Sequence, residues 1–166
     1  MRNLSLVQDR TLHDVTREIE INLSGPVRII QQFLPQLKTR QEALIVNVSS
    51  GLAFISYPAS PIYSATKAAL HSFTQSLRVQ LSGSSVTVVE LAPPSVETSL
   101  FRGEFVAETK GQKAMDVVAL VKQTLVAIEA GKLEIRPGLS NVLRAMSRIA
   151  PQFMLRQIVQ TMKPKT

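Results

Sequence analysis

Two short apolar runs enclose a helix-forming stretch, and this arrangement restricts the fold more than any other feature of the chain. The runs Ala43–Val48 and Val86–Leu91 are rich in β-branched residues with little polar alternation, which is typical of strands in a parallel sheet. Between them, apolar residues recur at helical spacing over 63–81, and Ser82-Gly83 ends the helix. Two strands joined through a helix imply a right-handed parallel crossover. The predicted fold class is therefore α/β, with ligands expected at the carboxyl ends of the strands.

A long helix is predicted ahead of the first strand, over about residues 12–37, because apolar residues recur there at three- and four-residue steps. Gly25-Pro26 interrupts this helix. Pro26 lacks the N–H that would bond the carbonyl of Asn22, and its ring crowds that carbonyl. We therefore expect a bend that leaves the Asn22 carbonyl free. A bend that only fits the helix to the sheet is the alternative.

Tyr63 and Lys67 stand four residues apart, so on a helix their side chains project from the same face. An adjacent ammonium favours the phenolate and lowers the pKa of a phenol, and a shift of about three units needs about 4 kcal/mol. Ser50, at the end of the first strand, would then hold a carbonyl or hydroxyl oxygen while Tyr63 exchanges a proton with it. The alternative is an ordinary surface tyrosine and lysine on an amphipathic helix.

The combined pattern is more specific than either part. An apolar strand ending in Ser49-Ser50, thirteen positions from Ser50 to Tyr63, and then Tyr-Ser-Ala-Thr-Lys-Ala-Ala resemble the active-site segment of the short-chain dehydrogenase/reductase family. The resemblance implies a Rossmann-like, doubly wound parallel sheet and NAD(P)-dependent hydride transfer to or from a small-molecule carbonyl or alcohol. It places catalytic roles on Asn22, Ser50, Tyr63 and Lys67. Asn22 would use its main-chain carbonyl to hold a water that links Lys67 to solvent.

The turn after the second strand resembles the Pro-Gly-x-Val-x-Thr turn that contacts the nicotinamide in this family. Val96 and Thr98 match that turn, and the resemblance implies that they bind NAD or NADP together with Tyr63 and Lys67. Pro94 stands where glycine is usual. A proline there removes an N–H and fixes φ, so the local turn must differ from the family pattern. A plain proline-rich strand exit is the alternative.

The glycine-rich, pyrophosphate-binding turn with which the family begins is not in this sequence, because the seven glycines never occur in that spacing. The chain thus resembles a C-terminal portion of the family domain, with subgroup features of the oxidoreductases named for teichoic-acid D-alanylation. One edge of the strand Ala43–Val48 is then expected to lack a partner, which favours association through that edge or a need for another chain. A catalytically inactive remnant that acts as a dimerisation or binding scaffold is the alternative function.

Residues 1–138 are assigned to the Rossmann-like domain, and residues 139–166 to a basic tail of two amphipathic segments separated by Pro151. The net charge of +7 belongs to this end of the chain, since residues 135–166 hold six Lys and Arg and no acid. Without aromatic platforms or a nucleic-acid reading motif, nucleic acid is not an expected partner. The tail is expected to pack beside the cleft or a neighbouring subunit. The alternative is contact with an anionic membrane or with an acyl or phosphate-bearing substrate.

The remaining features add expectations of their own. There is no cysteine, which excludes disulfides and thiolate metal sites, and neither His13 nor His71 has metal-ligand spacing, so surface or capping roles are expected for both. No apolar run approaches the roughly 20 residues of a membrane span, and the N-terminus lacks a signal-peptide centre, so a cytoplasmic protein is expected. The family resemblance implies a homodimer or tetramer. Residues 97–112 are predicted to form a mobile loop over the cleft, 115–130 a helix and 132–136 a last strand.

Overall fold

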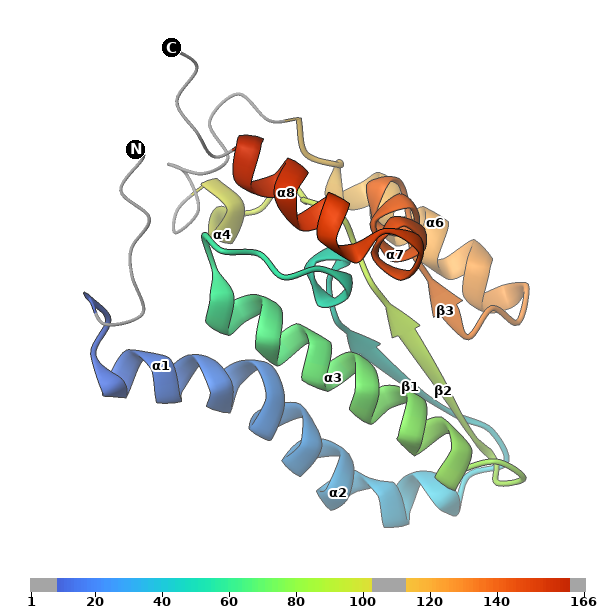
Figure 1. Cartoon of the computed structure of the whole chain (residues 1–166). Helices are drawn as coiled ribbons and strands as arrows, with labels where there is room; N and C mark the ends of the chain where they lie inside the picture. Colours follow the sequence, from blue (N-terminus) through green and yellow to red (C-terminus); the bar gives the residue numbers. More distant parts are fainter. Residues whose placement is uncertain (1–8, 103–112, 162–166) are drawn as a thin grey trace.

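The computed structural model describes residues 9–102 and 113–161. Three strands, β1 (Ala43–Val48), β2 (Val86–Leu91) and β3 (Glu134–Ile135), form one parallel sheet in the order β1-β2-β3 (Figure 1). β1 and β2 have the predicted bounds, and the helix between them makes the predicted crossover. The α/β class, with a partial doubly wound sheet, is therefore confirmed.

Two layers of helices cover the sheet (Figure 1). On one face lie α2 (Gly25–Lys38) and α3 (Pro61–Gln80), and on the other lies α6 (Val117–Glu129). The core of the first face consists of buried residues from both helices and from β1 and β2, namely Ile30, Ile45, Leu77, Leu81, Val86 and Val88. The core of the second face joins α6 to β2 and β3 through Val89, Leu91, Leu120 and Ile135.

Helix α6 and strand β3 are both shorter than the predicted spans 115–130 and 132–136. The side chain of Asp116 caps α6, so the helix begins at Val117 and not at the predicted residue 115. Gly131 adopts φ 71°, and Lys132 still donates its N–H to a carbonyl of the helix end. Lys132 therefore still belongs to the turn that ends α6, although the sequence pattern predicted that the strand begins there.

The predicted N-terminal helix is divided into three parts. Helix α1 (Leu12–Ile19) leads into a π-helical turn, η2 (Glu20–Ser24), and then into α2, and the axis changes direction between α1 and α2 (Figure 1). The N–H of Gly25 bonds the carbonyl of Glu20, five residues earlier. Because Pro26 has no N–H to donate, the helix widens locally into this longer-range bonding pattern. The predicted bend is thus present at Gly25-Pro26.

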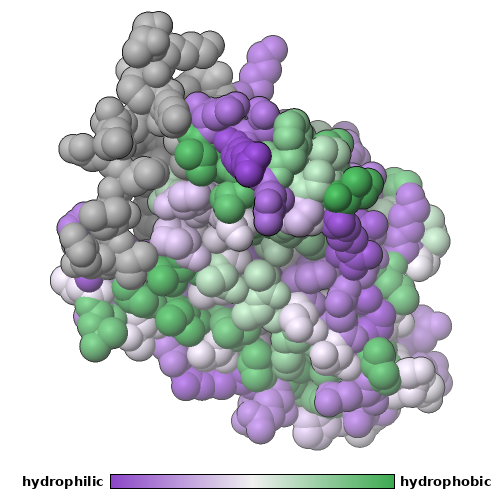
Figure 2. Space-filling model, in the orientation of Figure 1, coloured by the Kyte–Doolittle hydropathy of each residue, from purple (hydrophilic) through white to green (hydrophobic). Residues whose placement is uncertain are grey.

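One face of β1 is open. Leu44, Val46 and Val48 are 44%, 37% and 49% exposed, because α6 covers β2 and β3 on that side but does not reach β1. Among the described residues β1 pairs with β2 alone, so its other edge carries no strand. Figure 2 shows the side of the molecule that carries α1 and α3, where apolar side chains are also exposed among hydrophilic ones.

Two helices follow β3 and extend along the carboxyl ends of the strands (Figure 1). They are α7 (Leu139–Ile149) and α8 (Pro151–Thr161), which meet at the predicted break before Pro151. α7 packs on η3 (Gly51–Phe54), a single 3₁₀ turn that follows β1. Residues 103–112 of the predicted loop and residues 162–166 of the tail lie outside the described residues. Within the described ranges, no helix has the length and apolar character needed to cross a bilayer.

Candidate active site

The carboxyl end of β1 presents a serine from a short turn. Beyond Val48 the chain stays extended, and the N–H of Ser49 still donates to the carbonyl of Leu91, at 2.8 Å. Ser50 is also extended, and its Oγ accepts the N–H of Leu52 at 3.1 Å, which begins the turn η3. The side chain of Ser50 is buried, so strand and turn together hold its hydroxyl in one place.

Tyr63 lies in the first turn of α3. Pro61 begins this helix, where its missing N–H costs no helical hydrogen bond. From this position the hydroxyl of Tyr63 reaches the end of β1 and shares a side-chain hydrogen bond with Ser50. The structure thus brings together the two hydroxyl groups that the sequence spacing pairs.

Lys67 lies one turn further along α3, on the same side. Its Nζ donates to the carbonyl of Val48 at 3.0 Å and lies 5.6 Å from the ring centroid of Tyr63. The ammonium is therefore directed toward the end of β1 and contacts the face of the phenol ring. Ser50, Tyr63 and Lys67 converge at one edge of the sheet, where a parallel α/β fold binds its ligands.

The electrostatics of this cluster differ from the prediction. Burial raises the pKa of Tyr63, and the negative charge of Glu18 on α1 raises it further, while the hydrogen bond from Ser50 acts in the opposite direction. Burial also lowers the pKa of Lys67. The prediction that Lys67 lowers the pKa of Tyr63 is therefore wrong for this structure, because loss of hydration dominates both groups and the ammonium bonds a carbonyl instead of the phenol oxygen.

The other three predicted residues lie on neighbouring elements. Asn22 is half-buried in the turn η2, which packs against α3. Val96 lies beyond the end of β2 and pairs with Met115 in an isolated bridge. Thr98 accepts the N–H of Phe101 with its Oγ1 at 3.3 Å and so begins the short helix α4 (Ser99–Arg102). The structure therefore groups three predicted residues closely and places the other three on the adjoining helix and strand exit.

Sequence reasoning missed a buried polar cluster directly behind this site. The expected surface or capping role of His71 is wrong, because its side chain is only 15% exposed and its Nδ1 lies 2.7 Å from Oε2 of Glu90. Glu90 is 2% exposed, and its Oε1 accepts a hydrogen bond from Ser49 at 2.5 Å. An acidic residue within an otherwise apolar strand is a signal for such a cluster, since a buried carboxylate requires partners.

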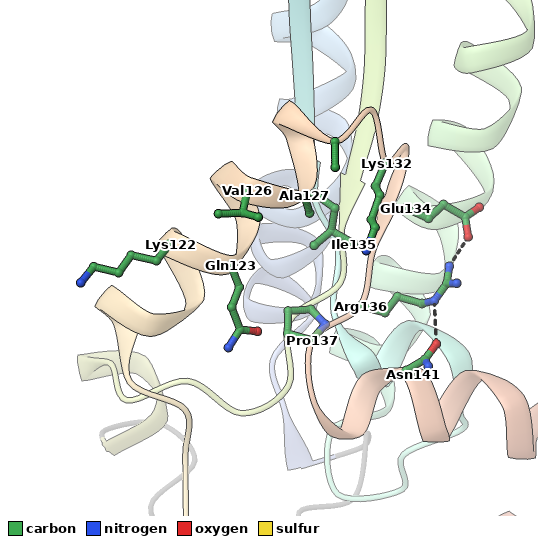
Figure 3. A pocket seen from close by; sticks show the side chains of 11 residues that line it. Lys122, Gln123, Val126, Ala127, Lys132, Glu134, Ile135, Arg136, Pro137 and Asn141 are labelled. Carbon is green, nitrogen blue, oxygen red and sulfur yellow. Dashed lines mark hydrogen bonds and ion pairs between the residues drawn. The ribbon is translucent and has the colours of Figure 1, made fainter.

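A separate groove of about 660 Å³ lies between α6, β3 and the start of α7. Figure 3 shows its positive side chains, with Arg136 linked to Glu134 and to Asn141. Its lining consists of Lys122, Gln123, Val126, Ala127, Ala130, Lys132, Glu134, Ile135, Arg136, Pro137 and Asn141. None of the predicted catalytic residues lines this groove.

Sequence comparison identifies relatives over most of the chain. A profile of short chain dehydrogenases matches residues 1–109. The chain is 41% identical over 132 residues to the uncharacterized oxidoreductase DltE of Bacillus subtilis. This alignment covers 77% of this chain and 52% of that protein. It is 29% identical over 136 residues to an uncharacterized oxidoreductase of Staphylococcus epidermidis, with 80% of this chain and 59% of the relative covered. The chain therefore spans only about half of the length of these relatives.

Solved structures show the same arrangement of elements. A short chain dehydrogenase from Burkholderia cenocepacia, crystallised in complex with NADP, superposes with a TM-score of 0.79 at 24% identity, over 98% of this chain and 66% of that one. A short-chain dehydrogenase from Sphingobium yanoikuyae in complex with NADPH superposes with a TM-score of 0.73 at 25% identity, over 97% and 61%. Because the family profile covers well over half of its residues, the chain belongs to the short-chain dehydrogenase family, in which it is similar to DltE.

Proposed function

We propose that this chain provides the proton-transferring part of an NAD(P)-dependent oxidoreductase that acts on a small carbonyl or alcohol. The observation that carries the proposal is the hydrogen bond between Ser50 and Tyr63 beside the ammonium of Lys67, at the carboxyl end of β1. The complexes of two similar structures with NADP and NADPH support the cofactor class. The choice between NAD and NADP stays open in this proposal.

The proposed roles follow from the protonation states. A bound nicotinamide supplies or accepts a hydride at the substrate carbon. Tyr63 donates its proton to the substrate oxygen during reduction and takes it back during oxidation, while Ser50 donates a hydrogen bond to the same oxygen. Because burial raises the pKa of Tyr63, the phenol carries its proton at neutral pH. This state is suited to reduction of a carbonyl.

Lys67 and the strand exit supply the nicotinamide side of the proposed site. An ammonium has three N–H donors, and Val48 is the one hydrogen-bond acceptor that Lys67 uses among the described residues. Two donors are therefore available for the hydroxyl groups of a ribose, which fits the proposed cofactor. Val96 and Thr98 are proposed to contact the carboxamide, and Asn22 to sustain the proton relay through its main-chain carbonyl.

A titration of the full chain with NADPH and with NADH, followed by nicotinamide fluorescence, tests this proposal. We expect saturable binding that Lys67→Met weakens, because the substitution removes the donors to the ribose. Lys122→Met, which neutralises an exposed lysine of α6, serves as the matched control and is expected to bind like the unmodified chain. Binding of neither nucleotide, or equal binding by both variants, would contradict the proposal.

A scaffold function is the second candidate. Ile29 and Phe33 lie one turn apart on α2 and are 61% and 53% exposed, so α2 presents an apolar strip to the solvent. A second copy of the chain would cover this strip in a homodimer or tetramer. Phe33→Glu is then expected to convert a dimer into monomers in sedimentation velocity, and a chain that dimerises but binds no nicotinamide supports this candidate over the enzyme.

The basic tail is proposed to complete the cleft in either case. α7 packs on η3, the turn that follows Ser50, and α8 packs on α7. The described part of the tail, residues 139–161, would then act as a helical cover at the carboxyl ends of the strands.

A further inference from the structure

A chain of polar contacts runs through the molecule behind the candidate active site. Its centre is the carboxylate of Glu90 on β2, which is 2% exposed and receives Ser49 at 2.5 Å on one oxygen and His71 at 2.7 Å on the other. The second ring nitrogen of His71, Nε2, lies 3.3 Å from Nη1 of Arg144 on α7. His71 therefore stands between a buried carboxylate and a guanidinium.

The proton on the imidazole ring of His71 is assigned by its two neighbours. A guanidinium only donates hydrogen bonds, so Nε2 must be the accepting nitrogen toward Arg144. The single proton of the neutral ring is then on Nδ1, from which it is donated to Glu90. In this arrangement a neutral imidazole links the negative charge of Glu90 to the positive charge of Arg144, and every polar atom of the ring has a partner.

These contacts hold the turn that carries Ser50 at both of its ends. On one side, Ser49 directly precedes Ser50 and is bonded to Glu90. On the other, Phe54 ends η3, and its ring lies edge-on to His71 with 5.0 Å between centroids. The guanidinium of Arg144 lies 5.2 Å from the same phenyl ring. The turn is thus clamped between α3 and α7 by residues that are far apart in the sequence.

The far end of the contact chain is also anchored. Arg144 pairs with Glu134 at 3.3 Å, and Glu134 in turn contacts Arg136, whose Nε donates to Asn141 of α7 (Figure 3). Ser49 is only 1% exposed, and its hydroxyl is directed to Glu90 and not to His71. The hydroxyl of Ser49 is therefore inaccessible to a substrate and does not face the imidazole, so these residues do not form a second nucleophilic site of the serine–histidine type.

We propose that His71 is a positioning residue, which bridges Glu90 to Arg144 through its Nδ1–H tautomer and thereby fixes the turn that holds Ser50 against Tyr63. The catalytic consequence rests on the proposed function, whereas the positioning itself is measurable without cofactor. The groups that face this ring are Glu90 from β2, Arg144 from α7 and Phe54 from η3.

The tautomer is measured directly in the full chain by ¹⁵N NMR of the imidazole nitrogens. The chain has two histidines, and His13 is exposed on α1, where Asp14 is its only ion-pair partner among the described residues, so it serves as the internal reference for a solvent-exposed ring. We expect His71 to show a protonated Nδ1 and an unprotonated Nε2. A protonated Nε2 on His71, or signals of His71 averaged between the two tautomers, would overturn the proposal.

The effect on the site is measured through Tyr63. The chain has two tyrosines and no tryptophan, so in a Tyr57→Phe background the tyrosinate absorbance reports Tyr63 alone. The hydrogen bond from Ser50 lowers the pKa of Tyr63. We therefore expect His71→Leu to move the titration to higher pH, and His71→Asn, which keeps a donor near Glu90, to move it less. His13→Leu is the control and leaves the titration unchanged.

The outcomes separate this proposal from the proposed function. If His71→Leu keeps the circular dichroism of the unmodified chain and its Tyr63 titration is unchanged, the positioning role is overturned, whatever nucleotide the chain binds. If Tyr63 shifts as expected and no nicotinamide binds, the positioning role stands and the oxidoreductase proposal fails. If His71→Leu does not fold, the tautomer of the unmodified chain decides the question.

Discussion

Gly51, the first residue of the turn η3, leaves no room for a side chain. A Cβ at this position would stand 2.6 Å from Oγ of Ser140, the buried second residue of α7. We expect Gly51→Ala to lower the free energy of unfolding by about 1–3 kcal/mol, because α7 must shift to relieve the overlap. Urea unfolding followed by circular dichroism measures this change.

Ser140 provides the matched control. Its Oγ is buried without a hydrogen-bond partner among the described residues, so Ser140→Ala is expected to be neutral or stabilising. In the double variant, the loss caused by Gly51→Ala should shrink, since the nearest atom is gone. Strictly additive effects would show that the two positions do not touch.

The composition of the candidate site was predictable, but its electrostatics were not. Four-residue spacing on a helix places Tyr63 and Lys67 on one face, because backbone geometry fixes that relation. The resemblance to the family's active-site segment adds Ser50 to them. The raised pKa of Tyr63 depends on burial and on Glu18 of α1, which no local pattern reveals. The same holds for His71, whose partners lie on β2 and α7.

Tyr63 and Lys67 give the stability of the fold opposite dependences on pH. The pKa of Tyr63 is raised from 10.0, so its contribution is complete below about pH 10 and is lost as the pH rises through the raised value. The pKa of Lys67 is lowered from 10.5, so its contribution is present above that pH and is lost as the pH falls through the lowered value.

Tyr63→Phe separates the two contributions. In a Tyr57→Phe background, we expect the free energy of unfolding of this variant to fall less steeply above pH 10 than that of the parent, by at most about 1.4 kcal/mol per pH unit. Urea unfolding at several values between about pH 8 and 11 checks this. Parallel curves for variant and parent would show that Tyr63 titrates alike in the folded and unfolded chain.

At the scale of elements, the N-terminus of α6 depends on one side chain. Oδ1 of Asp116 accepts the N–H of Ala119 at 2.9 Å, and Leu120 follows directly in the core that α6 shares with β2. We expect Asp116→Ala to cost about 0.5–2 kcal/mol of unfolding free energy. Asp116→Asn keeps the acceptor and is expected to retain most of it, whereas equal losses in both variants would point to the charge instead of the cap.

The type of an element was predictable where its apolar pattern extends over many residues, whereas the residues at which elements begin and end were not. The long N-terminal helix and the break before Pro151 follow from apolar spacing and from proline. The π-helical turn at Glu20–Ser24 cannot be predicted from that spacing. A helix can accommodate the missing N–H of Pro26 in two ways, by losing one hydrogen bond or by inserting one residue, and the apolar spacing does not distinguish them. The structure has the inserted residue, and the π-helical turn η2 that results packs against α3.

At the scale of the whole molecule, the sheet is covered unevenly. α6 shields Val89 and Leu91 of β2, whereas the adjoining residues Leu44, Val46 and Val48 of β1 face outward. The apolar run Ala43–Val48 alone predicts a strand buried on both faces. Its open edge is expected from the family resemblance, because the glycine-rich first part of the family domain is not in this sequence. An apolar strand with an open edge and an open face is prone to pair with another chain.

Val46→Lys tests whether this surface drives association. Val46 is 37% exposed at the middle of β1, so the lysine ammonium reaches water while the pairing of β1 with β2 is kept. We expect the unmodified chain to self-associate with increasing concentration in sedimentation velocity, and Val46→Lys to associate less than the unmodified chain, with the free energy of unfolding changed by less than about 1 kcal/mol. Val79→Lys is the matched control, because Val79 is 75% exposed on α3 and lies apart from β1. This variant should associate like the unmodified chain. A monomeric unmodified chain, or equal association of both lysine variants, would show that the surface of β1 does not mediate contact between copies.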